Sequence, residues 1–222
     1  MAVTTVGSQV ATVASLLGNR TDLNAKISQW LVDGYYDLAT TIPFETLEDS
    51  EENVTVAGID SYDYPENARA IKDLTIYVNK APRQLYKRNM KIIRQYQAQT
   101  TSIPAIWAPF GTQYVLRGVP NGAYPMTVDF WMWPTIAAVI NSTVIQLPPD
   151  WLEIVRYEAQ MRGFIDLQEP DKAAGIRTIL YGNPMKPGMP GLIKQRLTRI
   201  QAEYQDANYG MRPRTTRYTN VR

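Results

Sequence analysis

The stretch Leu147-Pro-Pro-Asp-Trp-Leu-Glu-Ile-Val-Arg-Tyr-Glu-Ala159 marks the point where the sequence changes from strand-like alternation to a helical period. The two prolines end the preceding segment, and Asp150 is a typical N-cap residue for a helix that follows. The apolar residues beyond it share one helix face: Ile154, Tyr157, Met161, Phe164 and Ile165. This spacing predicts an amphipathic helix from Asp150 onward.

The same period recurs on both sides of this stretch. Apolar residues from Thr21 to about Ala39 fall at i, i+4, i+7 and i+8, which predicts a first amphipathic helix. Further helices are predicted over Asp171–Leu180 and from about Pro190 to Tyr209, and the Pro- and Gly-rich segment Tyr181–Gly191 between them is predicted to be a loop. Each helix has a single apolar stripe, so we expect helices remote in sequence to pack on one another.

Residues between the first helix and Leu147 alternate with period two and are rich in turn residues. The predicted strands are Val54–Ala57, Ile71–Val78, Tyr114–Arg117 and Tyr124–Trp133. Both faces of the last strand are mostly apolar or aromatic, so we expect it to be covered on both sides. Asn121-Gly122 predicts a hairpin turn, Ile103–Phe110 an extended loop and Arg88–Gln97 a short helix.

The predicted fold class is therefore α+β, a helical bundle with an inserted antiparallel β-rich domain. Residues 21–47 and 147–209 are assigned to the bundle, and residues 48–146 to the insertion. We predict a flexible N-terminal segment over residues 1–20 and an extended basic arm over residues 210–222.

Two residue types are missing from the 222 residues, Cys and His. Their absence excludes disulfides, thiolate zinc sites and thiol nucleophiles, and it removes the usual general base. The acidic run Glu48–Glu52 fits no calcium-loop spacing and is predicted to be a solvated loop, although a glycosidase-like pair of acids stays open. Phosphate-loop, dinucleotide and nucleophile-elbow motifs are absent from the sequence. We expect no enzyme activity, no metal and no cofactor.

The formal net charge is +2, but the charged residues are unevenly distributed along the chain. Four Arg and no acid lie in Arg212–Arg222, which leaves 19 basic and 21 acidic residues in the rest of the chain. A second basic segment holds six cations and no acid: Lys80, Arg83, Lys87, Arg88, Lys91 and Arg94. Such a segment can follow a nucleic-acid backbone, or it can meet an acidic partner or neighbour. The 14 Tyr and 5 Trp favour an assembly protein, because these residues are enriched at interfaces.

In the order of these segments the chain resembles the head-to-tail adaptor (connector) proteins of tailed bacteriophages. The resemblance extends from about Thr21 to Tyr209. The stretches that carry it are Asp22–Leu38, Tyr62–Glu66, Ile71–Val78, Pro104–Ala108, Val128–Pro134, Leu147–Ala159 and Asp166–Ala174. Packing and turn patterns, rather than chemical motifs, make up these matches.

The resemblance implies a virion protein that is assembled in the host cytoplasm and has no membrane contact. It implies a ring of twelve copies that binds the portal protein above and tail or nozzle proteins below. DNA would pass through the lumen during genome packaging and ejection. By its position, the C-terminal arm is assigned to portal binding through Met211, Arg212, Arg214, Arg217, Tyr218 and Arg222. The alternative is a nucleic-acid-binding protein that uses the Lys80–Arg94 segment.

Overall fold

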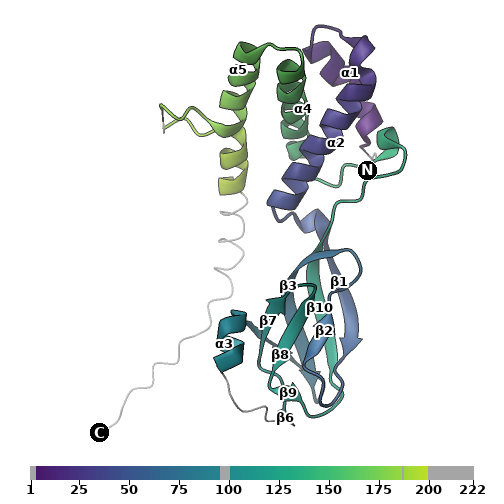
Figure 1. Cartoon of the computed structure of the whole chain (residues 1–222), viewed down its shortest axis with the longest axis vertical. Helices are drawn as coiled ribbons and strands as arrows, with labels where there is room; N and C mark the ends of the chain where they lie inside the picture. Colours follow the sequence, from purple (N-terminus) through teal and green to yellow (C-terminus); the bar gives the residue numbers. More distant parts are fainter. Residues whose placement is uncertain (1–3, 96–100, 187, 200–222) are drawn as a thin grey trace. The chain divides into compact units, whose positions relative to one another are not determined.

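The computed structural model describes residues 4–95, 101–186 and 188–199. The chain divides into two compact units (Figure 1). A helical unit comprises Met1–Gly34, Val139–Ser142 and Asp150–Arg222, and a β-rich unit comprises Tyr35–Ala138 and Thr143–Pro149. Helices and mainly antiparallel sheets are combined in one chain, as the predicted α+β class requires.

Amphipathic helices form the helical unit: α1 (Val6–Leu16), the first part of α2 (Asn24–Thr41), α4 (Leu152–Asp166) and α5 (Pro170–Tyr181). A further helical segment covers residues 192–199. A 3-10 turn at Pro149–Trp151 precedes α4, so this helix begins two residues later than Asp150 predicts. Ile154 and Phe164 of the predicted apolar face are buried, whereas Ile165 is exposed.

Helix α1 occupies most of the segment 1–20, where the sequence predicts a flexible terminus. The side chain of Thr5 caps the helix, and Val6 and Val13 are fully buried. Arg156 of α4 donates two hydrogen bonds, of 2.8 and 2.6 Å, to Oε1 of Gln9. The segment is rich in small uncharged residues, so the sequence does not predict a helix there. The i, i+7 spacing of Val6 and Val13 nevertheless fits one buried face of a helix.

Among the described residues, the β-rich unit contains two four-stranded sheets and one short two-stranded sheet. The first has the order β1 (Glu48–Val54), β10 (Pro125–Met132), β3 (Ala68–Val78) and β4 (Ala81–Gln84), with antiparallel pairs throughout. The second has the order β2 (Ser61–Asp63), β8 (Gln113–Arg117), β7 (Ile106–Phe110) and β5 (Tyr86–Lys87), in which β5 runs parallel to β7. A short parallel pair joins β6 (Thr101–Ser102) to β9 (Val119–Pro120).

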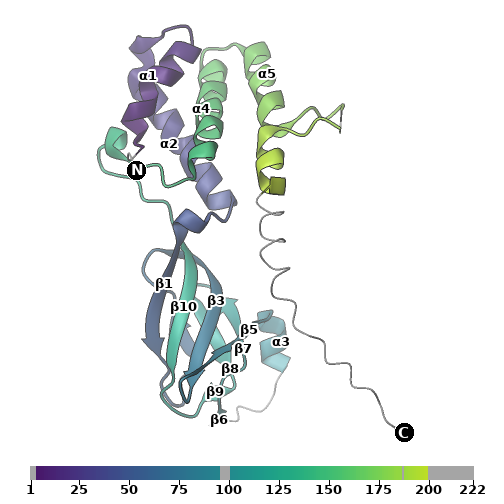
Figure 2. The same cartoon turned by 180° about the vertical axis from the view of Figure 1, so that it is seen from behind.

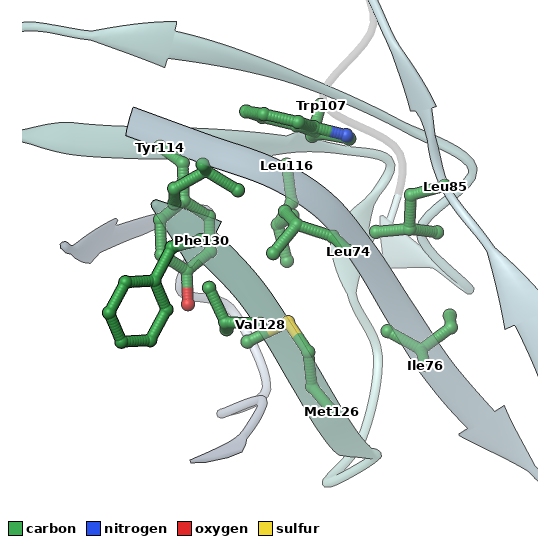
Figure 3. Packing of buried hydrophobic residues seen from close by; sticks show 10 residues of the cluster. Leu74, Ile76, Leu85, Trp107, Tyr114, Leu116, Met126, Val128 and Phe130 are labelled. Carbon is green, nitrogen blue, oxygen red and sulfur yellow. The ribbon is translucent and has the colours of Figure 1, made fainter. Parts of the chain in front are cut away.

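Side chains from both sheets meet in one hydrophobic core, which makes the unit a β-sandwich (Figure 3). The core residues are Ile71, Leu74, Ile76, Leu85, Trp107, Tyr114, Leu116, Met126, Val128 and Phe130. Helix α3 (Met90–Gln95) covers the other face of the second sheet, where Ile93 packs on Ala108 and Val115. The predicted short helix is thus present, and it closes the apolar outer face of that sheet.

Two predicted loops are strands. The acidic run Glu48–Glu52 is most of β1, and the predicted loop Ile103–Phe110 contains β7. Because β1 lies at a sheet edge and both of its faces are open, it can carry charges that hide a strand from pattern analysis. The predicted strand Val54–Ala57 is wrong beyond Val54, where β1 ends.

Two predictions about the strand Tyr124–Trp133 also differ from the structure. Asn121-Gly122 forms no hairpin, because β8 and β10 on its two sides belong to different sheets. Only one face of β10 is covered. Val128, on the core face, is fully buried, whereas Asp129, on the outer face, is half-buried. Trp133, which follows the end of β10, is 45% exposed. The outer face of the first sheet therefore remains open to solvent.

Candidate functional site

Four of the six cations of Lys80–Arg94 lie at one edge of the β-sandwich, and the other two are on α3, which packs on the outer face of the second sheet. Strands β4 and β5 are the edge strands of the two sheets, and only Leu85 separates them in sequence. They therefore lie at the same edge, and α3 follows β5 directly (Figure 2). We call β4, β5 and α3, together with the turn before β4, the basic edge. Its cations are all exposed: Lys80, Arg83, Lys87, Arg88, Lys91 and Arg94.

Aromatic rings, rather than carboxylates, hold two of these cations. The ammonium of Lys87 lies 5.0 Å from the centroid of the Trp107 ring, and the Arg94 guanidinium lies 5.4 Å from that of Phe110. None of the six cations forms an ion pair with any residue that the structure describes. Tyr86 and Phe110 add exposed rings, at 69% and 50%. Unpaired cations among exposed aromatic rings are typical of an interaction surface.

The opposite edge of the sandwich is acidic. Strands β1 and β2 end the two sheets on that side, and residues 44–67 contain eight acids and no Lys or Arg. We call β1, β2 and their connection the acidic edge. The hydroxyl group of Tyr114 on β8 lies near acids of both strands. Burial is the main cause that raises the pKa of Tyr114, followed by Tyr62 and by the charges of Glu51 on β1 and Asp63 on β2. Acids of both strands thus lie near one hydroxyl group.

Two bulges in β3 aim charged side chains at neighbouring elements. The register with β10 skips Lys72, and the ammonium of Lys72 donates to Oε2 of Glu48 at 2.6 Å. A second skip places Arg69 so that its Nη1 donates to the carbonyl of Ala39, near the end of α2, at 2.7 Å. A cation at a helix C-terminus is favourable. Glu48, Lys72 and Arg69 therefore have structural roles within the β-rich unit.

Asp129 on β10 gives the first testable prediction, because it lies directly opposite Asp73 of β3. Burial raises the pKa of Asp129, and the charge of Asp73 raises it further. The folded chain therefore binds this proton more tightly than the unfolded chain, so ionisation lowers stability as the pH rises through the folded pKa. We expect Asp129→Asn to be more stable than the native chain at pH 7, by up to about 1 kcal/mol as for other cross-strand pairs.

This advantage should disappear as the pH falls below the unfolded pKa of about 3.9, where the native carboxyl is protonated in both states. Thermal unfolding of both chains at pH 7 and at pH 3 measures the difference. The expectation would be contradicted if the Asp129→Asn chain were less stable than the native chain at pH 7. It would also be contradicted if the Asp129→Asn chain were more stable than the native chain by the same amount at pH 7 and at pH 3.

No group of three or more acidic, His or Cys side chains within residues 4–95, 101–186 and 188–199 could hold a metal ion. A hollow of about 360 Å³ beside Tyr77 has a single carboxylate in its lining, that of Glu52, whereas glycosidase-like hydrolysis needs two. In the same part of the chain, no helix is long and apolar enough to cross a membrane.

The predicted portal-binding arm is not placed by the structure. Met211, Arg212, Arg214, Arg217, Tyr218 and Arg222 all lie outside the described residues. The sequence therefore predicts the basic edge by its cations, but it does not predict that the acids of residues 44–67 gather at the opposite edge. The signal for that edge was present, since the eight acids are uninterrupted by any cation.

Comparison with protein-family models gives one match over nearly the whole chain. The model described as SU10 adaptor protein matches residues 4–214, which include the whole β-rich unit and most of the helical unit. No match is found among curated proteins.

Proposed function

The chain belongs to the SU10 adaptor protein family, a family of phage head-to-tail adaptors, and we propose that it forms a ring beneath the portal that links capsid to tail. The predicted resemblance to head-to-tail adaptors is thereby confirmed at the level of the family. In the proposed particle twelve copies surround a lumen through which DNA passes during packaging and ejection. The helices of each copy form a bundle, and the protein acts as a structural virion component without catalysis or cofactor.

The family match is the observation that carries this proposal, because residues 4–214 cover the β-rich unit and most of the helical unit. The sandwich supports it with two edges of unlike composition. A cyclic ring needs two different surfaces on each copy, since its interfaces are heterologous.

Mass photometry of the purified chain with the portal protein from the same phage tests the proposal. Adaptor function predicts a gain on each portal particle of roughly twelve chains of 25.2 kDa. The chain alone is the reference, because assembly can wait for the portal. Portal particles that gain no mass would contradict the adaptor function.

A second prediction concerns the arm. Deleting residues 210–222 removes four arginines and no acid. Charge-assisted hydrogen bonds contribute about 1.5–3 kcal/mol each, so losing two or more should weaken portal binding at least about a hundredfold. Binding is measured by titrating labelled portal.

Far-UV circular dichroism of the truncated chain should stay unchanged, which separates lost contacts from lost folding. The matched control replaces the four arginines by lysine, which keeps the charge but not the bidentate geometry, and it should bind with intermediate affinity. Equal binding by the truncated and full chains would reject a portal-docking arm.

A further inference from the structure

We propose that the acidic edge of the sandwich in one copy docks against the basic edge of the next copy. The occupant of each edge is thus a second copy of this chain. The inference deepens the ring proposed above, on which it rests, by naming the surfaces through which neighbouring β-rich units meet.

Open strand edges are the first step. Each of β1, β2, β4 and β5 pairs with one neighbouring strand in the part of the chain that the structure describes. Both sheets therefore end at both sides in a strand whose outer edge pairs with no other described strand; Figure 2 labels β1 and β5, one such strand of each sheet. On β1, the N–H groups of Ser50 and Val54 donate to Oδ1 of Asp49 and of Asn53. Open edges tend to associate with other chains unless something covers or blocks them.

Charge complementarity is the second step. The acidic edge, residues 48–63, carries six acids and no cation, and the basic edge lies within residues 80–94, with six cations and no acid. The segregation holds for both sheets, since each ends in an acidic-edge strand on one side and a basic-edge strand on the other. Complementary arrays of this kind steer association and fix its register.

The same charges exclude a two-fold contact. Two acidic edges, or two basic edges, would place like charges opposite each other, which is destabilising. Association must then join unlike edges, and each added copy presents one free edge of each kind. Head-to-tail contacts of this type close into a ring when the rotation between copies permits it.

Side chains, rather than a continuous sheet, are expected to form the contact. Pro82 in β4 lacks an N–H group. In β1, Asp49 and Glu51 lie opposite Phe130 and Val128, so their charges point to the same side of the sheet as the core. Inward-pointing charges on an edge strand hinder regular strand pairing.

Binding of nucleic acid would account for the basic edge alone, whereas binding of a second copy accounts for both edges. A phosphate backbone would occupy the basic edge, leave the acidic edge without a partner and be repelled by it. A second copy satisfies both edges with one contact. Nucleic-acid binding therefore becomes an outcome of the test.

Charge reversal with mixing tests the proposal. One variant reverses the acidic edge with Glu51→Lys and Glu52→Lys, and the other reverses the basic edge with Arg83→Glu and Arg88→Glu; all four side chains are exposed. For each variant alone, with or without portal, mass photometry should show a fraction of chains in rings at least tenfold lower than for the native chain. An equal mixture should restore assembly, because each reversed edge then meets the reversed edge of the other variant.

A chain with all four reversals should also assemble with itself, since both of its edges are exchanged. Circular dichroism should be unchanged in every variant. Rings that form equally well from each single variant would overturn the proposal. Tight, salt-dependent binding of duplex DNA that Arg83→Glu and Arg88→Glu abolish, without any effect on assembly, would assign the basic edge to nucleic acid instead.

Cross-linking separates failure of the edge contact from failure of the ring. The chain has no Cys, so Ser50→Cys on β1 and Gln84→Cys on β4 introduce single exposed thiols. A bis-maleimide should join the two variants when they are mixed, but neither variant to itself. Rings without this cross-link overturn the edge contact alone, and the cross-link without a ring on the portal contradicts the adaptor function alone. Absence of both overturns both proposals.

Discussion

Replacing Trp107 by alanine is expected to lower the free energy of unfolding by about 3–5 kcal/mol, the range for large aromatic residues in a core. The ring is fully buried between the two sheets, beside Leu74 and Leu116 (Figure 3). Strands from both sheets surround it, so the structure can relax only partly into the cavity. Equilibrium denaturation of the full chain, followed by tryptophan fluorescence and circular dichroism, measures the loss.

Trp133 provides the matched control. Its ring is 45% exposed and stacks on Tyr36 with 6.3 Å between the centroids. Trp133→Ala should therefore cost about 1 kcal/mol or less, close to an ordinary aromatic pair. A loss for Trp107→Ala as small as that for Trp133→Ala would show that the sandwich core does not depend on Trp107.

Trp107 also connects the sandwich core to the basic edge. The ammonium of Lys87 lies over the Trp107 ring and also donates to the carbonyl of Ile71 at 3.2 Å. Core packing therefore fixes part of the basic edge in place. A destabilised core should weaken association at that edge as well as folding.

Local periodicity explains which elements the sequence predicts well. Helices α2, α4 and α5 each carry an apolar stripe within one contiguous segment, and their observed bounds lie close to the predicted ones. Strand β7 was hidden because Pro104 and Pro109 favour a loop when no partner strand is known. Its partners β8 and β5 supply the pairing that makes it a strand.

Sheet order explains why half of the candidate site was missed. All six cations were recognised from the sequence, since charge is read directly. The acids of β1 were interpreted as a solvated loop, because the strand that pairs with them, β10, lies more than 70 residues away in sequence. Only the order of strands places acids and cations at opposite edges, and that order depends on contacts that no local pattern encodes.

Alanine substitution of two helical glycines should change stability in opposite directions. A Cβ on Gly34 of α2 would lie 2.9 Å from the Cβ of Glu158 on α4, and neither atom can move without shifting its helix. Gly34→Ala should therefore destabilise the helical unit by about 1–3 kcal/mol, as overpacking does. A Cβ on Gly175 of α5 would meet no described atom within 4 Å. Gly175→Ala should stabilise the unit by about 0.5–1 kcal/mol, because alanine favours a helix.

Both glycines lie inside helical segments, and the sequence alone gives no reason to treat them differently. The difference arises because α2 approaches α4 closely at Gly34, whereas Gly175 is exposed on α5. Denaturant unfolding followed at the helical circular dichroism band measures each change against the native chain. If Gly34→Ala raised stability as Gly175→Ala is expected to, helical propensity rather than close packing would govern the contact between α2 and α4.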